Sequence, residues 1–341
     1  MPTMSQEVVK TLPMQSRCAM TLEEIRDAMI EDPPNLENFK GGWASMENYR
    51  SNLRTVGLAP PASVPAISPE AGPLPEMLMA RFYYWDPVPA GLTNQDPHST
   101  RKLNAIDVIV TAPSEGKVSL LFSTRTNTYL GKKGGIIASL NIIFQSTDAT
   151  IRIDRGQSHL RLADEEIFLW LAVQHRDQPQ LAPDIRLDQI AGISSRDAAS
   201  RTADLKFGVD FERSNFLTAV AEKDTLGPID IAFAHHVGAE NHAYQIRIHV
   251  DGGFEVRKNS LHFPPEVLVR EDFMLETSLF LAYSMIPRLN SLFTADSANW
   301  STQRVDVIQK AMAALETRYK SLRAVLEQQL VGDSGSELTS P

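Results

Sequence analysis

The chain has 341 residues, of which 43% are hydrophobic, and its formal net charge is −9. This composition is typical of a globular protein that buries a core, and the length suits two or three domains. The acidic balance disfavours broad, charge-driven binding to nucleic acid or to an anionic membrane, although a local basic face is compatible with it. The net charge therefore makes binding to nucleic acid or to a membrane less expected, without excluding it.

The single cysteine, Cys18, excludes an intrachain disulfide and a multi-cysteine zinc site. The first residues lack a basic segment followed by an apolar core of signal-peptide length, and no apolar run reaches the ~18 residues of a membrane span. We therefore expect a cytoplasmic protein with no membrane association. Because no basic partner for Cys18 can be identified, we interpret it as a free thiol and not as a nucleophile.

Residues 1–57 predict a helical N-terminal segment behind a flexible arm. Thr21, followed by Glu23 and Glu24, is typical of a capped helix start, and Asp32-Pro33-Pro34 ends that helix. A second short helix is expected over 44–56. Six prolines then fall between Leu58 and Met77, which predicts an extended proline-rich linker over 58–79.

Residues 80–263 predict an α+β core with mainly antiparallel sheet. The stretch 117–162 reads as a strand, a weak helix, a strand over 140–145 and then a hairpin over 151–162. Next, residues 167–176 predict a helix that is apolar on all sides and therefore buried. The second part of the core repeats this order of strand, helix and three strands, and Asp251-Gly252-Gly253 is expected to form a tight turn.

These similarities suggest an internal duplication within the core. Aligning Ile151-Arg152-Ile153 with Ile246-Arg247-Ile248 gives one hairpin in each half. The prediction is two duplicated β-α-β-β-β units, over 80–176 and 177–263. The rival interpretation is chance, because alternating isoleucine and arginine is common on half-exposed strands.

Residues 264–330 predict a C-terminal helical hairpin, followed by a disordered tail over 331–341. The helices are expected over 266–292, with Pro287 bending or ending the first, and over 301–330, with a turn over 293–300. The last helix carries a heptad seam of Val305, Ile308, Met312, Leu315, Tyr319, Leu322 and Leu326. An apolar seam of this kind must pack, either on the preceding helix or on the same helix of a second chain. We expect the hairpin, in which Leu315→Asp would destabilise the monomer by several kcal/mol.

The sequence carries no complete catalytic or metal signature. GxSxG, HExxH, Walker-type and GxGxxG patterns are all absent, so no catalytic residue or cofactor is indicated. Four histidines lie close together in sequence, but alternation along a strand puts His235 and His236 on opposite faces. We therefore interpret His235, His236, His242 and His249 as polar residues at strand ends and not as a metal site.

Basic residues in two places are candidate anion-binding or nucleic-acid-binding groups. One set is a glycine-flanked loop, and the other lies on the polar faces of the two expected hairpins. The set comprises Arg125, Lys132, Lys133, Arg152, Arg161, Arg247 and Arg257. The alternative in each case is a solvated surface, because charged faces usually meet only water.

Taken together, these patterns favour a non-enzymatic interaction or regulatory subunit of an intracellular multiprotein complex. Its partner would be another protein, or a second copy, held through the C-terminal helix. The alternatives are a nucleic-acid-associated subunit that uses the basic hairpin faces, and an enzyme of unfamiliar type that acts on a phosphate-bearing substrate.

Overall fold

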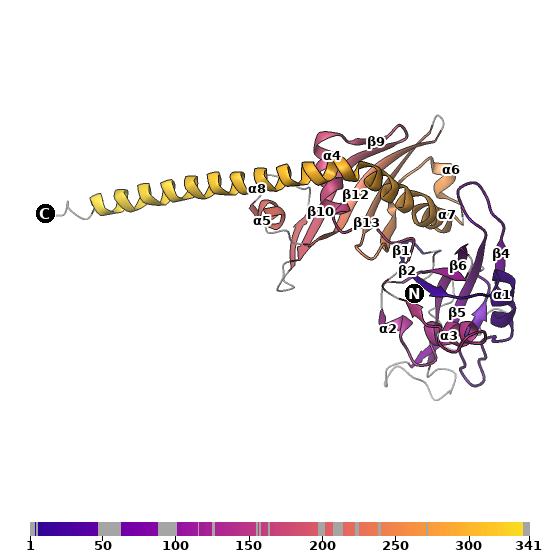
Figure 1. The fold of residues 1–341 in the computed structure, drawn as a ribbon. Helices are drawn as coiled ribbons and strands as arrows, with labels where there is room; N and C mark the ends of the chain where they lie inside the picture. Colours follow the sequence, from indigo (N-terminus) through magenta and orange to yellow (C-terminus); the bar gives the residue numbers. More distant parts are fainter. Residues whose placement is uncertain are drawn as a thin grey trace. The chain divides into compact units, whose positions relative to one another are not determined.

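The computed structural model describes residues 4, 6–46, 63–87, 101–114, 116–124, 127–154, 156, 158–162, 164–196, 202–206, 214–221, 225–237, 240–270 and 272–336. The chain divides into two compact units (Figure 1). The first comprises Met1–Ala163 and His235–Ser291, and the second comprises Asp164–Ala234 and Leu292–Pro341. The expected fold class is confirmed, since helices and antiparallel sheets form both units.

The first unit contains a seven-stranded antiparallel sheet in the order β3-β5-β6-β7-β2-β8, with β4 paired to β5. Its strands are β2 (Leu12–Arg17), β3 (Gly42–Ala44), β4 (Ala66–Ser68), β5 (Met77–Pro87), β6 (Arg101–Ser114), β7 (Lys117–Phe122) and β8 (Ile153–Asp154). Helices α1 (Leu22–Ile30) and α3 (Ile136–Gln145) cover one face of this sheet, and α2 (Asn127–Leu130) precedes α3. Ile25 and Met29 of α1 join Leu140 and Phe144 of α3 in one buried cluster with the sheet.

The start of α1 follows the predicted capping box. The Thr21 hydroxyl accepts a hydrogen bond from the Glu24 N–H at 3.2 Å, and the Glu24 carboxylate accepts one from the Thr21 N–H at 2.8 Å. These bonds satisfy two N–H groups that a helix start otherwise leaves open. The local sequence therefore determines where α1 begins.

The second sheet has the order β1-β14-β13-β12-β10-β11, with β9 paired to β10. Its strands are β1 (Val8–Lys10), β9 (Gln180–Ala182), β10 (Ile185–Arg196), β11 (Thr202–Lys206), β12 (Thr225–Val237), β13 (Glu240–Ile248) and β14 (Phe254–His262). The remaining helices are α4 (Ile167–Asp177), α5 (Ser214–Ala221), α6 (Pro265–Leu268), α7 (Phe273–Phe280) and α8 (Ile286–Ser336), and a π-helical turn, η2 (Leu281–Met285), joins the last two. As predicted, α4 is buried on all sides, from Ile167 through Val173.

The predicted turn between β13 and β14 is present. The Gly252 N–H donates to the His249 carbonyl at 2.9 Å, and the His249 N–H donates to the Gly253 carbonyl at 2.8 Å. Gly252 has a positive φ of 77°, and a side chain there would begin 2.4 Å from the Cα of Arg161. Both the turn and the close backbone approach require glycine at this position.

The expected C-terminal hairpin is wrong, because α8 is one continuous helix (Figure 1). The segment 293–300 is helical, and its Phe293 and Trp300 are buried. Asp and Asn in this segment are typical of loops, since they compete with the backbone for hydrogen bonds. Here the Asp296 carboxylate accepts a hydrogen bond from the Trp170 Nε1–H at 2.8 Å. Tertiary packing against α4 therefore keeps the segment helical.

Pro287 does not end the helix either. The preceding turn, η2, is π-helical, and α8 continues beyond it. A proline removes one N–H and clashes with the carbonyl four residues earlier. The wider turn accommodates this defect without stopping the helix.

The predicted duplication is not reproduced in the first half. The segment expected as a strand over 140–145 belongs to α3, because Ile136, Leu140 and Phe144 share one helical face and are buried. The β-branched residues in it suggested a strand. Within 151–162, the described residues contain only the short β8, which pairs with β2, so no hairpin matches β13–β14.

Three N-terminal predictions also change. The expected arm contains β1 and β2, and at Pro13 strand β2 has only β7 beside it, a position where proline is tolerated. The expected linker contains β4 and the start of β5, which pair with each other. In the helix expected over 44–56, Ala44 belongs to β3, and residues 47–56 lie outside the described part of the chain.

Trp300 provides a test of how α8 is anchored in the second unit. It is 2% exposed, and its Nε1–H donates to the Glu166 carboxylate at 3.2 Å. We expect Trp300→Ala to lower the free energy of unfolding by about 3–5 kcal/mol, as truncation of a buried tryptophan does. Urea unfolding measures the change, with Gln309→Ala, at an exposed position of the same helix outside the seam, as the matched control. A loss below about 1 kcal/mol for Trp300→Ala would contradict this anchoring.

Candidate functional site

The glycine-flanked loop does not present a group of unpaired cations. Arg125 lies outside the described residues. Lys132 forms an ion pair with Asp86, and its ammonium group lies 5.2 Å from the centre of the Tyr84 ring. Lys133 is exposed. The charge of Lys132 is therefore already balanced, and Lys133 alone carries little specificity for an anion.

The four arginines do not lie on two matching hairpins. Arg247 and Arg257 are on β13 and β14, whereas Arg152 lies immediately before β8 and Arg161 lies in an irregular segment. Arg161 donates to the Gly156 carbonyl. The premise of two equivalent arginine faces is therefore wrong.

The charge on the β13–β14 hairpin is largely balanced by Glu255. Its carboxylate lies 2.9 Å from the Arg257 guanidinium and 3.0 Å from the Lys10 ammonium group. Burial works to raise the pKa of Glu255, but hydrogen bonds from Lys10 and Arg257 outweigh this effect and hold the pKa below its usual value. This face is a local ion-pair network and not an open cationic surface.

A hollow of about 650 Å³ in the first unit contains Arg152 together with two cations that sequence reasoning missed, Arg17 and Lys117. Arg17 is the last residue of β2, and Lys117 is the first residue of β7. The hollow is lined by Gln15, Ser16, Arg17, Cys18, Ala19, Gly116, Lys117, Thr147, Asp148, Thr150, Ile151, Arg152 and Asp154. The only sequence signal for these two cations was their position at strand ends. For Arg17 this signal was missed, because β2 itself was not predicted.

Cys18 lies at the wall of this hollow but is buried, with 3% of its surface exposed. Burial raises the pKa of its thiol, a hydrogen bond from the Met20 backbone opposes this effect, and the charge of Glu24 adds to the increase. The thiol therefore stays protonated at neutral pH. Burial and a raised pKa both slow the reaction of a thiol with electrophiles.

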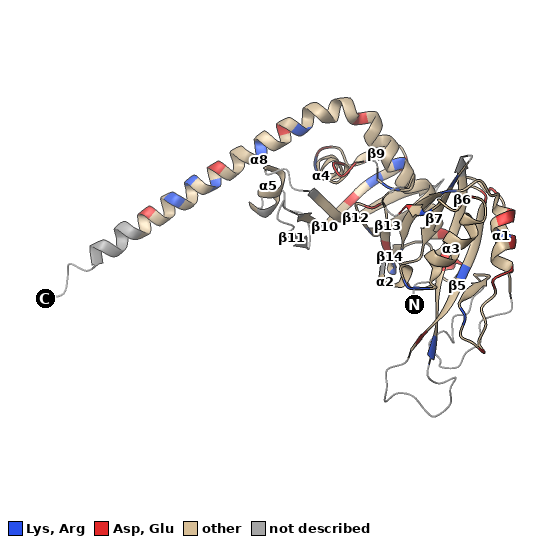
Figure 2. Ribbon diagram, turned by 60° about the horizontal axis from the view of Figure 1, so that its bottom comes forward, with Lys and Arg blue, Asp and Glu red and all other residues tan. Residues whose placement is uncertain are grey.

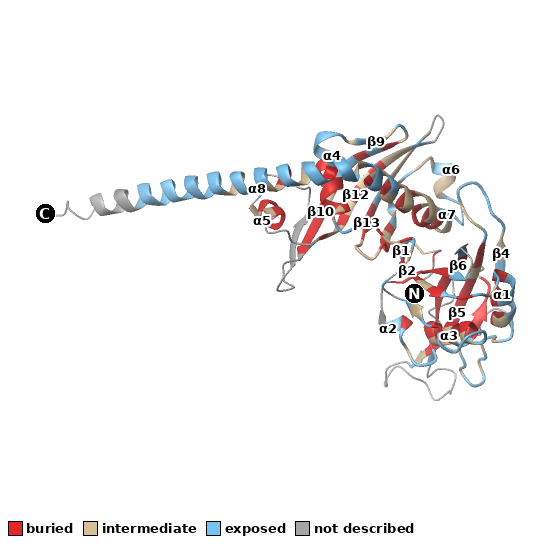
Figure 3. Cartoon of the chain, in the orientation of Figure 1, coloured by how far each residue is buried: buried red, intermediate tan, exposed pale blue. Residues whose placement is uncertain are grey.

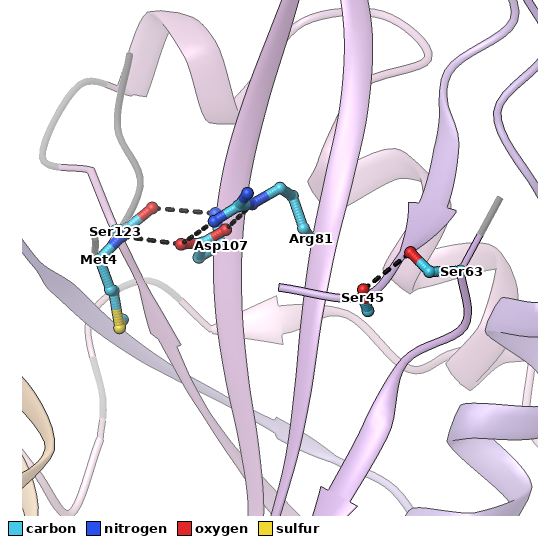
Figure 4. A network of polar contacts seen from close by, with 6 residues as sticks. All are labelled: Met4, Ser45, Ser63, Arg81, Asp107 and Ser123. Atoms are coloured by element: carbon cyan, nitrogen blue, oxygen red, sulfur yellow. Dashed lines mark hydrogen bonds and ion pairs between the residues drawn. The ribbon is translucent and has the colours of Figure 1, made fainter. Parts of the chain in front are cut away.

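A buried polar network occupies the sheet of the first unit (Figure 4). Arg81 of β5 and Asp107 of β6 are directly opposite one another, and their side chains are 1% and 0% exposed. The Arg81 Nε donates to Asp107 Oδ1 at 2.5 Å, and Nη2 donates to Oδ2 at 3.1 Å. The Met4 N–H donates to the same Oδ2 at 2.7 Å, and the Asp107 N–H donates to the Ser123 hydroxyl at 2.9 Å.

Burial opposes the charge on Arg81, but the neighbouring carboxylate of Asp107 outweighs this effect and raises the pKa of the guanidinium. The Arg81 guanidinium therefore keeps its charge at physiological pH. Since the carboxylate also accepts a backbone N–H, its hydrogen-bonding capacity is largely used within the chain. We assign this network to the stability of the sheet, because its polar atoms bond to one another and to the backbone of the chain.

The clustered histidines make separate contacts. His242 stacks on Phe263 with ring centres 4.5 Å apart, and His235 lies 5.1 Å from the Phe280 ring. Within the described residues, no group of three His, Cys, Asp or Glu side chains is placed to hold a metal ion.

The C-terminal seam is a further candidate surface. Of its predicted members, Ile308 and Leu315 are half-buried, and the others are exposed (Figure 3). The exposed fractions are 54% for Val305, 56% for Met312, 63% for Tyr319, 52% for Leu322 and 58% for Leu326, and neighbouring Val325 is 51% exposed. The buried face of this part of α8 is formed by Val307 and Ala311. The seam therefore has no partner among the described residues of this chain.

Residues of both charges recur along α8 (Figure 2), and three ion pairs form within the helix. Lys310 bonds to Asp306 at 2.7 Å, Lys320 bonds to Glu316 at 2.6 Å, and Arg323 bonds to Glu327 at 2.8 Å. Each pair spans one helical turn, the spacing at which opposite charges support a solvent-exposed helix. These pairs help α8 to remain helical beyond the part that packs on the second unit.

Comparisons with known proteins assign no family. No family model matches the sequence, and no curated protein matches it. Among solved structures, the chain is similar to the di-domain ARO/CYC StfQ from the steffimycin biosynthetic pathway, with 10% sequence identity over 85% of this chain and 99% of that chain. The TM-score is 0.17, which carries no information on fold or function. None of the helices in the described ranges is long and apolar enough to cross a membrane.

Proposed function

We propose that this protein is a non-enzymatic interaction protein that pairs with a second copy of itself through the seam of α8. The observation that carries the proposal is the apolar row from Val305 to Leu326, at alternating steps of three and four residues, in which all side chains are exposed except the half-buried Ile308 and Leu315. This spacing is typical of helices that pack side by side in a coiled coil. A contiguous row of exposed apolar side chains marks an interaction surface.

The free energy available from the seam is sufficient for a stable pair. Burying what remains exposed of one such side chain contributes roughly 1–2 kcal/mol. Two helices with five exposed seam side chains each therefore supply roughly 10–20 kcal/mol. This free energy is comparable with or larger than the estimated cost of association, which lies at about 4–15 kcal/mol.

The charges of α8 support a second copy in the antiparallel orientation. In a parallel pair, a residue beside the seam of one helix faces the residue five positions later on the other helix. Arg318 of one helix would therefore face Arg323 of the other, and these like charges would repel. In an antiparallel pair whose 319–322 segments cross, Glu316 of one helix lies near Arg323 of the other. Each contact of this kind occurs twice by symmetry.

Sedimentation equilibrium of the full chain over a range of concentrations tests the proposal. We expect a mass that rises from the 37.9 kDa of one chain to twice that value. The association should persist in high salt, because burial of apolar surface and not ion pairing drives it. A single-chain mass at all concentrations up to about 100 µM, where even a weak pair would form, would refute self-association.

A further inference from the structure

Arg17 and Lys117 form an unfavourable pair that the fold itself creates. They are directly opposite one another at the end of the β2–β7 ladder. Both side chains are exposed, and neither forms an ion pair with a carboxylate in the described part of the chain. Like charges directly opposite on neighbouring strands destabilise a sheet. A bound anion between them would remove this repulsion.

Arg152 adds a third cation from a separate segment of the same unit. Its Nη1 donates to the Ala149 carbonyl at 2.9 Å and to the Ile151 carbonyl at 2.6 Å. These bonds hold one side of the guanidinium and leave Nη2 and Nε without a bond among the described residues. The Ser16 hydroxyl donates to the Arg152 carbonyl at 3.3 Å, which ties this segment to β2. The third cation is therefore held in place before any ligand arrives.

The two carboxylates of the hollow are engaged with their own loops. Asp148 Oδ1 accepts hydrogen bonds from the Thr150 N–H and hydroxyl, both at 2.8 Å. Asp154 Oδ1 accepts one from the Gly156 N–H at 2.8 Å. Neither carboxylate forms an ion pair with the three cations. The three cations of the hollow are therefore available to bind an anion, because its two carboxylates form hydrogen bonds within their own loops.

We propose that this hollow binds the phosphoryl group of a small organic phosphate. Arginine forks match the oxygen geometry of phosphate, and lysine adds a point charge. A volume of about 650 Å³ is in the range of small-molecule sites, so space remains for an organic group beside Ile151 and Ala19. The site lies in the first unit and is independent of the seam on α8.

Calorimetric titration of the full chain with phenyl phosphate tests the proposal at constant ionic strength, with inorganic phosphate and sodium chloride as comparison titrants. We expect saturable binding of phenyl phosphate, weaker binding of phosphate and none of chloride. Arg17→Gln and Lys117→Gln should each weaken binding at least about tenfold, since each removes one charge-assisted contact. Lys133→Gln, an exposed cation outside the hollow, is the matched control and should bind as the parent does.

Thermal unfolding without ligand gives a second measurement that separates a ligand site from a structural role. Because each of these two substitutions removes the repulsion, it should leave the melting temperature unchanged or raise it while binding is lost. A lower melting temperature in both variants would show that the cations stabilise the fold, and would overturn the proposal. It would also be overturned by the absence of saturable binding in the parent, or by unchanged affinity in both variants.

Discussion

Leu322→Asp is expected to convert the self-associated protein into a folded single chain. Leu322 is 52% exposed in the isolated chain, so an aspartate there remains solvated and costs the monomer little. In the pair, the same carboxylate would be buried in an apolar seam without a partner, which costs several kcal/mol. Sedimentation equilibrium should show the mass of one chain, and circular dichroism should show unchanged helix content.

Ala324→Asp is the matched control for this prediction. Ala324 is exposed on the same helix two residues away, but it lies outside the seam. It should retain self-association. Leu315→Asp, which the hairpin interpretation singled out, is a poorer test because Leu315 is half-buried and its substitution changes the single chain as well. If Leu322→Asp and Ala324→Asp self-associate equally, the seam is not the contact.

Arg81→Met is expected to destabilise the first unit by about 3–5 kcal/mol, because it leaves the Asp107 carboxylate buried and uncompensated. The pair is less than 2% exposed, so water cannot replace the lost partner. Arg81→Met combined with Asp107→Leu should recover much of the loss, since apolar residues often replace a buried ion pair at little cost. Denaturant unfolding of the single and double variants gives the coupling free energy.

Arg26→Met provides the matched control for this second prediction. Arg26 bonds to Asp27 at 2.8 Å, but the two side chains are 34% and 63% exposed and solvent screens the pair, so the change should cost at most about 1 kcal/mol. A loss of similar size for Arg81→Met and Arg26→Met would mean that the buried pair adds nothing beyond a surface pair.

Local patterns in the sequence predicted the features that depend on neighbouring residues. The capping box at Thr21, the turn at Gly252, the buried helix α4 and the spacing of the seam all follow from residues a few positions apart. In contrast, β2 is a strand because β7 and β8 pair with it, more than a hundred residues later. Strand pairing over such distances leaves no periodic signal in a short window.

The candidate sites also differ in whether neighbouring residues or distant strands determine them. The seam of α8 was predicted from spacing alone, but its exposure depends on the segment 293–300, where Trp170 and Asp296 hold the helix straight through the expected turn. Arg17 and Lys117 meet only because β2 pairs with β7, and Arg81 meets Asp107 only through the β5–β6 register. When distant strands pair and bring two charges together, the sequence around either charge does not predict the contact.

The buried thiol of Cys18 makes the orientation of the proposed pair measurable. A thiol with a raised pKa and little exposure reacts slowly with maleimides and methanethiosulfonates, so a cysteine placed on the surface can be labelled selectively without removing the natural one. Ala313 is exposed on α8, several turns before the helix ends. Spin labels at that position would face each other across parallel helices, whereas in the antiparallel pair they would be displaced along the helix axis by about 20 Å, a difference that pulsed electron paramagnetic resonance measures.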